Sequence, residues 1–197
     1  MSKGSLFVIS GPSGTGKGTV CAQLLKEEKV FLSISATTRD KRIGEEEGVT
    51  YYYKTKEEFE KMIETGEMLE YAIYGGNYYG TPKKAVTDML ENGKNVILEI
   101  EPQGALKVKE QMPEAVLIFI VPPSISELRK RLTERGREDN SEIEKRINAA
   151  KWEFTQSPKY NYVIVNDDLM TCVRETLDII NATNERQQMI EKLLSEI

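Results

Sequence analysis

A glycine-rich segment near the amino terminus, Gly-Pro-Ser-Gly-Thr-Gly-Lys at residues 11–17, has the composition of a phosphate-binding loop. Glycines let the backbone curl so that its N–H groups point inward, and the amino end of a following helix adds a positive dipole. A predicted strand at residues 6–10 precedes the segment and a helical pattern follows it, as such a loop requires. We therefore predict that a nucleoside triphosphate is bound by Gly11, Pro12, Ser13, Gly14, Thr15, Gly16, Lys17, Gly18 and Thr19.

The loop departs from the usual form of its motif at one position. The lysine is commonly followed by Ser or Thr, whose hydroxyl binds Mg²⁺, whereas Gly18 follows Lys17 here and Thr19 comes next. Lys17 is still expected to place its charge on the β and γ phosphates, and Thr19 is a candidate to hydrogen-bond a phosphate. The alternative is a glycine-rich turn that only joins a strand to a helix, against which the three glycines, the lysine and the flanking patterns argue.

A second group of residues could bind another phosphate. Arg39 and Arg42 lie three residues apart after a predicted strand, and Tyr51 follows closely. Guanidinium groups bind phosphate oxygens in pairs, and a phenol hydroxyl supplies one more donor. The alternative for these residues, taken alone, is a surface turn with solvated arginines.

Carboxylates at two places suit a purine base that carries N–H donors. Glu99 and Glu101 end an otherwise apolar strand, where open α/β sheets bind ligands, and Glu70 ends another strand-like segment. Guanine presents two donors on one edge, whereas adenine presents an acceptor there, so a carboxylate favours guanine. Glu70 and Glu101 are the candidates to read the base.

Composition removes several classes of function. The 197 residues include no histidine, which excludes a His-based triad, a His metal site and an imidazole base. The net charge of −5 argues against broad binding to nucleic acid or to a membrane. Cys21 and Cys172 have no metal-ligand spacing and are expected as buried thiols. The first apolar run is too short for a signal peptide or a membrane span, so a cytoplasmic location is expected.

The elements that must position these residues alternate between strands and helices. Short runs rich in Val and Ile are predicted as strands at residues 6–10, 31–35, 95–100, 116–121 and 162–165. Their alternation with amphipathic segments is typical of parallel βαβ units. The length suits one core, so we expect a single α/β domain, a three-layer sandwich around a parallel sheet.

Three segments depart from this alternation. Residues 37–82 are polar and rich in Gly and Tyr, and are interpreted as an inserted β-rich subdomain with one helix at 56–64. Residues 134–140 are charged and look like a mobile flap. Residues 168–197 have the pattern of a long amphipathic helix, whose Met and Leu side chains are expected in the core rather than in an interface.

Spaced motifs in the same order resemble the guanylate kinase family over nearly the whole chain. The motifs are GPSGTGKGT, SATTRDKRIGE, GNYYGT, LEIEPQG, PPS, ERGRE and VNDD. The resemblance implies a P-loop kinase fold with a core at residues 1–36, 83–123 and 150–197, a GMP-binding subdomain at about 37–82 and a small helical lid at about 124–149. It implies the activity of that family, which transfers the γ-phosphate of Mg-ATP to GMP or dGMP in guanine nucleotide biosynthesis and recycling.

The resemblance also implies residue roles. Arg39, Arg42, Tyr51 and Tyr79 would hold the GMP phosphate, and Ser35, Glu70, Thr81 and Glu101 would read guanine. Many relatives have Asp at the last position and an apolar residue in place of Pro102. Arg135, Arg137 and Arg146 would be lid charges that close over ATP, and Asn166 and Asp167 would lie near the adenine.

Catalysis in this interpretation is alignment and charge compensation. Lys17, Mg²⁺, Arg39, Arg42, Arg135 and Arg146 would compensate charge, and Glu99, beside GMP, is expected to act on Mg²⁺ through water, with no direct protein ligand predicted. Two alternatives stay open: a peptide-binding scaffold module of the same fold, and a kinase for another small molecule such as a phosphorylated ribose. ATP and GMP are the expected partners, without nucleic acid or membrane, and a homodimer is left open.

Overall fold

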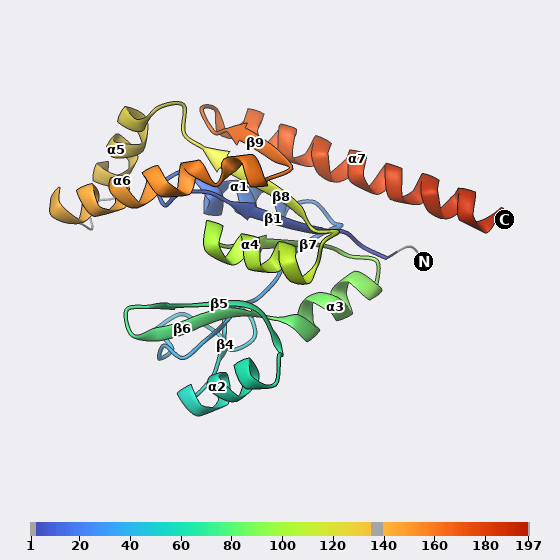
Figure 1. Ribbon diagram of the computed structural model, residues 1–197, viewed down its shortest axis with the longest axis horizontal. Coiled ribbons are helices and arrows are strands. Elements are labelled where there is room, and N and C mark those ends of the chain that lie inside the picture. Colours follow the sequence, from blue (N-terminus) through green and yellow to red (C-terminus); the bar gives the residue numbers. More distant parts are fainter. Residues whose placement is uncertain (1–2, 135–139, 197) are drawn as a thin grey trace.

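A computed structural model describes residues 3–134 and 140–196. The strands and helices form a core around one sheet, with a smaller sheet beside it and a long helix at the carboxyl end (Figure 1). Arg135 and Arg137 lie outside the described residues, as does the predicted flap at 134–140 except for its first and last residues. Among those that are described, no helix is both long enough and apolar enough to cross a membrane.

The core sheet is parallel and has the order β2-β7-β1-β8-β9. Its strands are β1 (Leu6–Ser10), β2 (Val30–Leu32), β7 (Asn95–Glu99), β8 (Val116–Val121) and β9 (Tyr162–Val165). Their carboxyl ends meet at one edge, where the loop after β1 and the acidic end of β7 lie side by side, because Ile9 pairs with Glu99. A parallel sheet places its ligands at this edge.

Helices cover both faces of the core sheet, so the predicted three-layer arrangement is confirmed. Phe7 and Ile9 of β1 face a cluster that includes residues of α1 (Lys17–Leu24) and α7 (Leu169–Ser195). Leu6 and Val8, on the other face, pack against α3 (Lys83–Glu91) and α4 (Pro102–Gln111). Alternate side chains of β1 therefore enter opposite cores, as the pleat of a strand requires. The short 3-10 helix η1 (Ser157–Lys159) precedes β9.

A second sheet, within the segment predicted as an insertion, has the order β4-β3-β6-β5. Its strands are β3 (Ala36–Thr37), β4 (Tyr52–Tyr53), β5 (Met68–Tyr74) and β6 (Asn77–Pro82). The hairpin of β5 and β6 turns at Gly75 and Gly76, both with positive φ, as a two-residue hairpin turn requires. Helix α2 (Lys56–Glu64) has the predicted bounds and packs Phe59 on Tyr78, with ring centroids 5.2 Å apart.

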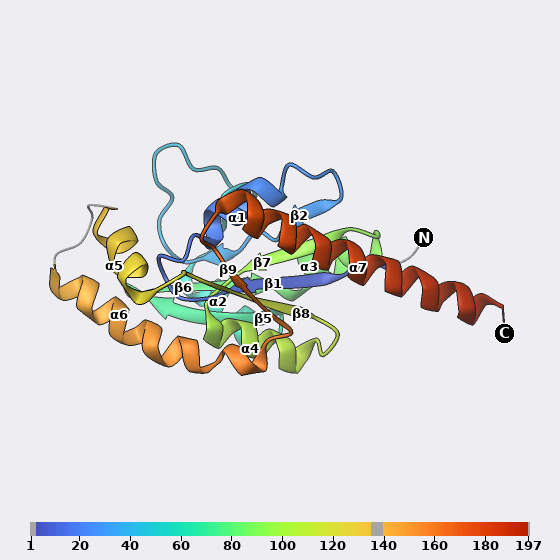
Figure 2. The same ribbon diagram turned by 90° about the horizontal axis from the view of Figure 1, so that it is seen from above.

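Two helices, α5 (Ile125–Glu134) and α6 (Asn140–Thr155), form a projection at one end of the molecule (Figure 2). They pack together through Leu128, Leu132, Ile143 and Ile147, all buried. Helix α6 runs unbroken past residue 149, where the predicted lid ends. The division into core, subdomain and lid stays a prediction.

Several predicted boundaries need correction. The strand predicted at residues 31–35 is β2, Val30–Leu32, because the chain leaves the core sheet after Ser33 and enters the second sheet at Ala36. The strand at 95–100 ends at Glu99, and the last helix begins at Leu169, with Asp168 as its amino-terminal cap. Met189, Leu193 and Leu194 of that helix are exposed, so their assignment to the core is wrong, because the end of α7 extends beyond the sheet (Figure 2).

Candidate functional site

The glycine-rich loop follows β1 and runs into α1, as predicted. Gly11, Gly14 and Gly16 all have positive φ, and Gly16 is the residue before the first turn of α1. Side chains are strained in this region of backbone conformation, and a Cβ on Gly16 would also meet the amide of Asn166. The glycines therefore allow the backbone conformation that turns the loop's N–H groups inward.

Lys17 folds back over this loop. Its Nζ donates to the carbonyl oxygens of Gly11 at 2.6 Å and of Pro12 at 3.0 Å. Burial lowers the pKa of Lys17, and the negative charges of Glu99, Glu101 and Glu153 oppose that shift. The ammonium is thus held among acidic groups at the point where a polyphosphate would enter.

Three residues far away in the sequence contact the phosphate loop or its neighbours. Arg146 of α6 donates from Nη1 to Ser13 Oγ at 2.7 Å. Asn166, buried after β9, donates from Nδ2 to the carbonyl of Thr15 at 2.8 Å. Arg131 of α5 donates from Nη2 to the carbonyl of Asn166 at 2.9 Å, while Asp167 beside it is exposed. Side chains from α6 and from the residue after β9 therefore hydrogen-bond the loop directly.

Glu99 stands between the loop and a neighbouring cavity. Its Oε1 is 3.4 Å from the position that a Cβ of Gly18 would take, so its carboxylate lies against the first turn of α1. Glu99 also lines a cavity of about 580 Å³ between the two sheets. An acidic group therefore lies beside the phosphate loop at Gly18.

The cavity collects most of the residues predicted for the acceptor. Ser35, Tyr51, Glu70, Tyr79, Glu99 and Glu101 line it. Thr81 lies behind them: its Oγ1 donates to Glu70 Oε1 at 2.8 Å, across the pairing of β5 with β6. Glu70 is only 7% exposed, and this burial raises its pKa. Pro102, the departure from many relatives, opens α4 at a position that proline favours.

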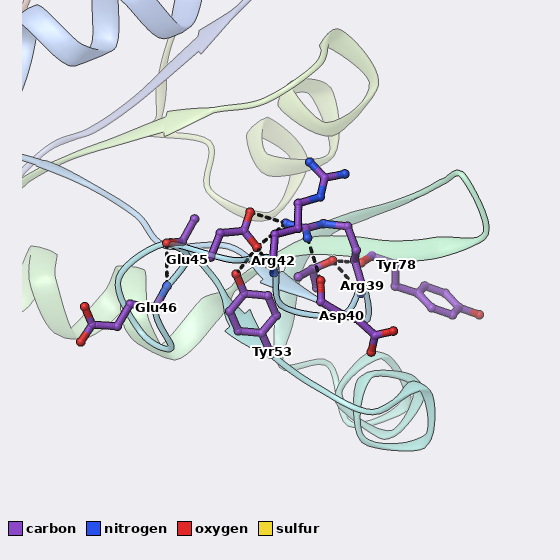
Figure 3. Close-up of polar contacts among 9 residues, drawn as sticks. Arg39, Asp40, Arg42, Glu45, Glu46, Tyr53 and Tyr78 are labelled. Atoms are coloured by element: carbon purple, nitrogen blue, oxygen red, sulfur yellow. Dashed lines mark hydrogen bonds and ion pairs between the residues drawn. The ribbon is translucent and has the colours of Figure 1, made fainter.

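The predicted phosphate-binding residues Arg39 and Arg42 are not among the residues that line this cavity. They belong to a cluster of polar contacts around Glu45 (Figure 3). Nη2 of Arg39 donates to both carboxylate oxygens of Glu45, at 2.7 and 2.9 Å, and its guanidinium lies 5.6 Å from the ring centroid of Tyr51. The backbone N–H of Arg42 donates to Oε2 of Glu45 at 2.9 Å, and the side chain of Arg42 is exposed. The ring of Tyr51 lies 6.0 Å from that of Tyr79.

Glu45 is the centre of this cluster, and no role was predicted for it. The Tyr53 hydroxyl donates to its Oε2 at 2.7 Å (Figure 3). Its contact with Arg39, together with the bonds from Arg42 and Tyr53, lowers the pKa of Glu45 to about 2. Arg131, Lys107 and Glu153 were not predicted either, because each occurs in a helical pattern where exposed charge is ordinary. Glu45 lies inside the SATTRDKRIGE motif, which was the available signal.

No cluster of three His, Cys, Asp or Glu residues that could hold a metal occurs within residues 3–134 and 140–196. Glu99 is the acidic side chain nearest to the place where the usual motif carries its hydroxyl. Cys21 and Cys172 are free and buried, as predicted, and burial raises the pKa of Cys172 to about 11. Neither thiol is therefore poised as a nucleophile.

The comparisons with known proteins agree on one family. The family model described as guanylate kinase matches residues 3–183. A guanylate kinase of Halalkalibacterium halodurans is 50% identical over 96% of this chain and 94% of its own, and one of Clostridioides difficile is 49% identical over 98% and 95%. The crystal structure of guanylate kinase from Anaplasma phagocytophilum aligns with a TM-score of 0.72 at 37% identity, over 92% of this chain and 86% of that one.

Proposed function

The chain belongs to the guanylate kinase family, and from that premise we infer that it is an enzyme that transfers the γ-phosphate of ATP to GMP and releases ADP and GDP. The observation that carries this function is the position of Glu99, which borders both the phosphate loop and the cavity. Donor and acceptor sites therefore adjoin at one carboxylate, as direct transfer between two nucleotides requires.

The donor site is proposed on the core sheet. The loop from Gly11 to Thr19 would bind the phosphates of ATP, with Lys17 leaving its carbonyl partners to reach the β and γ phosphates. Arg146, which contacts Ser13, would compensate charge on the transferred group. Asn166 and Asp167 would lie near the adenine, and Arg135 and Arg137 would add charge from the lid.

The acceptor site is proposed on the second sheet. Glu70 and Glu101 would accept hydrogen bonds from guanine, with Ser35 beside them and Thr81 fixing one oxygen of Glu70. Arg39, Arg42, Tyr51 and Tyr79 would bind the GMP phosphate. Because the guanidinium of Arg39 already donates to the carboxylate of Glu45, a bound phosphate would have to replace or share that hydrogen bond.

Transfer itself needs no protein nucleophile. The residues would align a phosphate oxygen of GMP with the γ-phosphate and exclude water, and the cations named above would balance the charge that develops. Mg²⁺ is the proposed cofactor, and it neutralises charge on the ATP phosphates when bound. Glu99 offers the hard oxygen ligands that Mg²⁺ prefers and fits a role through bound water, so we propose no direct protein ligand.

Location and assembly are proposals as well. The two free, buried thiols suit a reducing compartment such as the cytoplasm. The exposed Met189, Ile190, Leu193 and Leu194 of α7 are the surface on which a homodimer would be sought. Sedimentation velocity over a range of protein concentrations would test it, and a single monomeric boundary at all concentrations would refute it.

The activity is tested by coupled ADP release with Mg-ATP and, separately, GMP, dGMP, AMP, CMP, UMP or no acceptor. Strong release with GMP and with none of AMP, CMP and UMP is expected, because only guanine presents two donors to the carboxylates. Glu70→Gln should raise KM for GMP by about tenfold to a hundredfold, since an amide replaces an acceptor with a donor. Binding of ATP without release for any nucleotide would refute the function.

A further inference from the structure

We propose that Lys107 is a positioning residue for GMP: held along β5, its ammonium supplies the positive charge that keeps the buried carboxylate of Glu70 an acceptor for guanine. This inference rests on the proposed function and names a residue outside the motifs that define it. Lys107 lines the same cavity as Glu70 and Glu101.

One carboxylate oxygen of Glu70 accepts a hydrogen bond from Thr81, and the other lies against α4 beside the cavity. Thr81 holds Oε1 at 2.8 Å, whereas Oε2 lies 2.8 Å from the position that a Cβ of Gly104 would take. Helix α4 therefore approaches the carboxylate closely at Gly104, which also lines the cavity. Oε2 is the atom we propose for the base. The ionised carboxyl only accepts, whereas the protonated one carries an O–H donor that would oppose the N–H donors of guanine.

Burial works against that ionised form. It raises the pKa of Glu70, and the negative charge of Glu101 adds to the shift. The bond from Thr81 and the positive charge of Lys107 act in the opposite direction. Among the described residues that bear on Glu70, Lys107 is thus the cation whose charge opposes the effects of burial and of Glu101.

The geometry fixes Lys107 in place. Its Nζ donates to the carbonyl of Tyr71 at 3.2 Å and lies 5.1 Å from the centroid of that ring. One helical turn later, Gln111 donates from Nε2 to the carbonyl of Leu69 at 2.8 Å. Two side chains of α4 thus bond the carbonyls on either side of Glu70 along the outer edge of β5, which lies at the end of its sheet.

Lys107 could act through its charge or only as a tether, and substitution separates the two. Lys107→Gln removes the charge but keeps an N–H donor for Tyr71, as Gln111 does for Leu69. Lys107→Arg keeps both, and Lys107→Met removes both. Lys109→Met is the matched control for lost charge, because Lys109 lies on the same helix but donates to Ala115 at 2.6 Å, away from β5.

The measurement is KM for GMP at saturating Mg-ATP, from about pH 6 to about pH 8.5, with GMP affinity by calorimetry in parallel. Lys107→Gln and Lys107→Met should raise KM and Kd for GMP by about twofold to fivefold at the low end, and much less at the high end. Without Lys107 the pKa of Glu70 rises further, so more of it is protonated as the pH falls. GMP loses a phosphate charge in the same range, but equally for every variant.

Lys107→Arg and Lys109→Met should match the wild type, KM for ATP should not change, and kcat should change less than KM. Added salt should shrink the difference between wild type and Lys107→Gln, because Lys107 is exposed. An unchanged KM for GMP in Lys107→Gln would overturn the inference. A rise in KM that is equal at every pH would also overturn it, because Lys107 would then act only as a tether. A wild-type protein that does not phosphorylate GMP would overturn the proposed function and this inference together. If the wild type is active, a negative result with the Lys107 variants overturns this inference alone.

Discussion

At the scale of single residues, Glu99 shows how a carboxylate can serve two sites. It ends β7 in the core sheet, lies against Gly18 and reaches the cavity on the other side. A Cβ at position 18 would lie 3.4 Å from Oε1 of Glu99, in ordinary van der Waals contact, so the carboxylate lies directly beside Gly18. We interpret Gly18 and Glu99 as a pair, in which a carboxylate lies next to the position where the usual loop carries its hydroxyl.

Glu99→Gln tests that pair. The substitution keeps the shape and removes the negative charge, so kcat should fall by about a hundredfold or more, the range found when one preorganised electrostatic contact is lost. KM for GMP and the unfolding midpoint should change little, because the side chain is exposed at the sheet edge. Turnover is measured by coupled ADP release. A variant with near-normal turnover would remove Glu99 from the mechanism.

Residue chemistry was largely predictable where a motif fixed it. The loop and the acidic end of β7 lie where the sequence placed them. Glu70 lies near the start of β5 rather than at the end of a strand, and the register of β5 with β6, which was not predicted, brings it to Thr81. The grip of Glu45 on Arg39 was not predictable, because a carboxylate six residues from an arginine has no fixed orientation in a loop. Arg131, Lys107 and Glu153 were missed for a related reason: position on a helix does not reveal what the helix faces.

At the scale of elements, α4 is the part of the core that contacts the second sheet at Glu70, the carboxylate proposed to read the base. Gly104 permits this approach. Gly104→Ala should push Glu70 off its bond with Thr81 and raise KM for GMP by about tenfold, the cost of one buried hydrogen bond. KM for ATP should stay as it is.

Stability gives Gly104→Ala a second readout. Alanine is favoured over glycine in a helix by about 1 kcal/mol, which offsets the crowding, so the denaturation midpoint should move little. Weaker GMP binding in a fully stable protein would identify close approach as the role of this glycine. An unchanged KM for GMP would show that Glu70 can shift freely, contrary to its burial.

The cap of α2 tests whether the second sheet unfolds with the core. Thr55 accepts the N–H of Glu58 at 3.1 Å, and Glu58 accepts the N–H of Thr55 at 2.8 Å, which makes a capping box. Thr55→Ala should lower the free energy of unfolding by about 1 kcal/mol. Thr87→Ala, inside α3, is the control and should be neutral or stabilising.

Chemical denaturation gives the global effect, and hydrogen exchange gives the local one. A loss of stability seen in both sheets would indicate one cooperative unit, whereas faster exchange confined to α2, β5 and β6 would indicate local opening. No effect in either experiment would contradict the cap as a stabilising contact.

Elements with a local pattern were predicted well, and non-local pairings were not. Helix α2 and strands β1, β8 and β9 have the expected bounds, because their apolar spacing is set within the segment itself. The end of β2 was misplaced because residues 33–37 pass from one sheet to another. The parallel pairing of two-residue strands β3 and β4 depends on partners far along the chain, which periodicity does not encode.

At the scale of the whole molecule, the two proposed substrate sites lie on different sheets that the chain joins at two places. One is the passage from β2 to β3, and the other is the junction of β6 with α3 at residues 82–83. Helix α6 contacts the phosphate loop through Arg146, and α5 packs beside it (Figure 2). Such an arrangement would let each substrate bind first at its own sheet, with transfer following once the two proposed sites approach each other.

Solution scattering tests that approach with four samples: the free protein, GMP alone, Mg²⁺ with a non-hydrolysable ATP analogue alone, and both ligands together. The radius of gyration should fall most with both, because the γ-phosphate and the GMP phosphate pull the two sheets and the α5–α6 pair around one point and expel water from it. Glu70→Gln at the same GMP concentration should close less, since its acceptor site is less occupied. Equal radii in all four samples would mean that the two sheets already stand at reacting distance, and the barrier to wasteful ATP hydrolysis would then have to come from the order of binding rather than from closure.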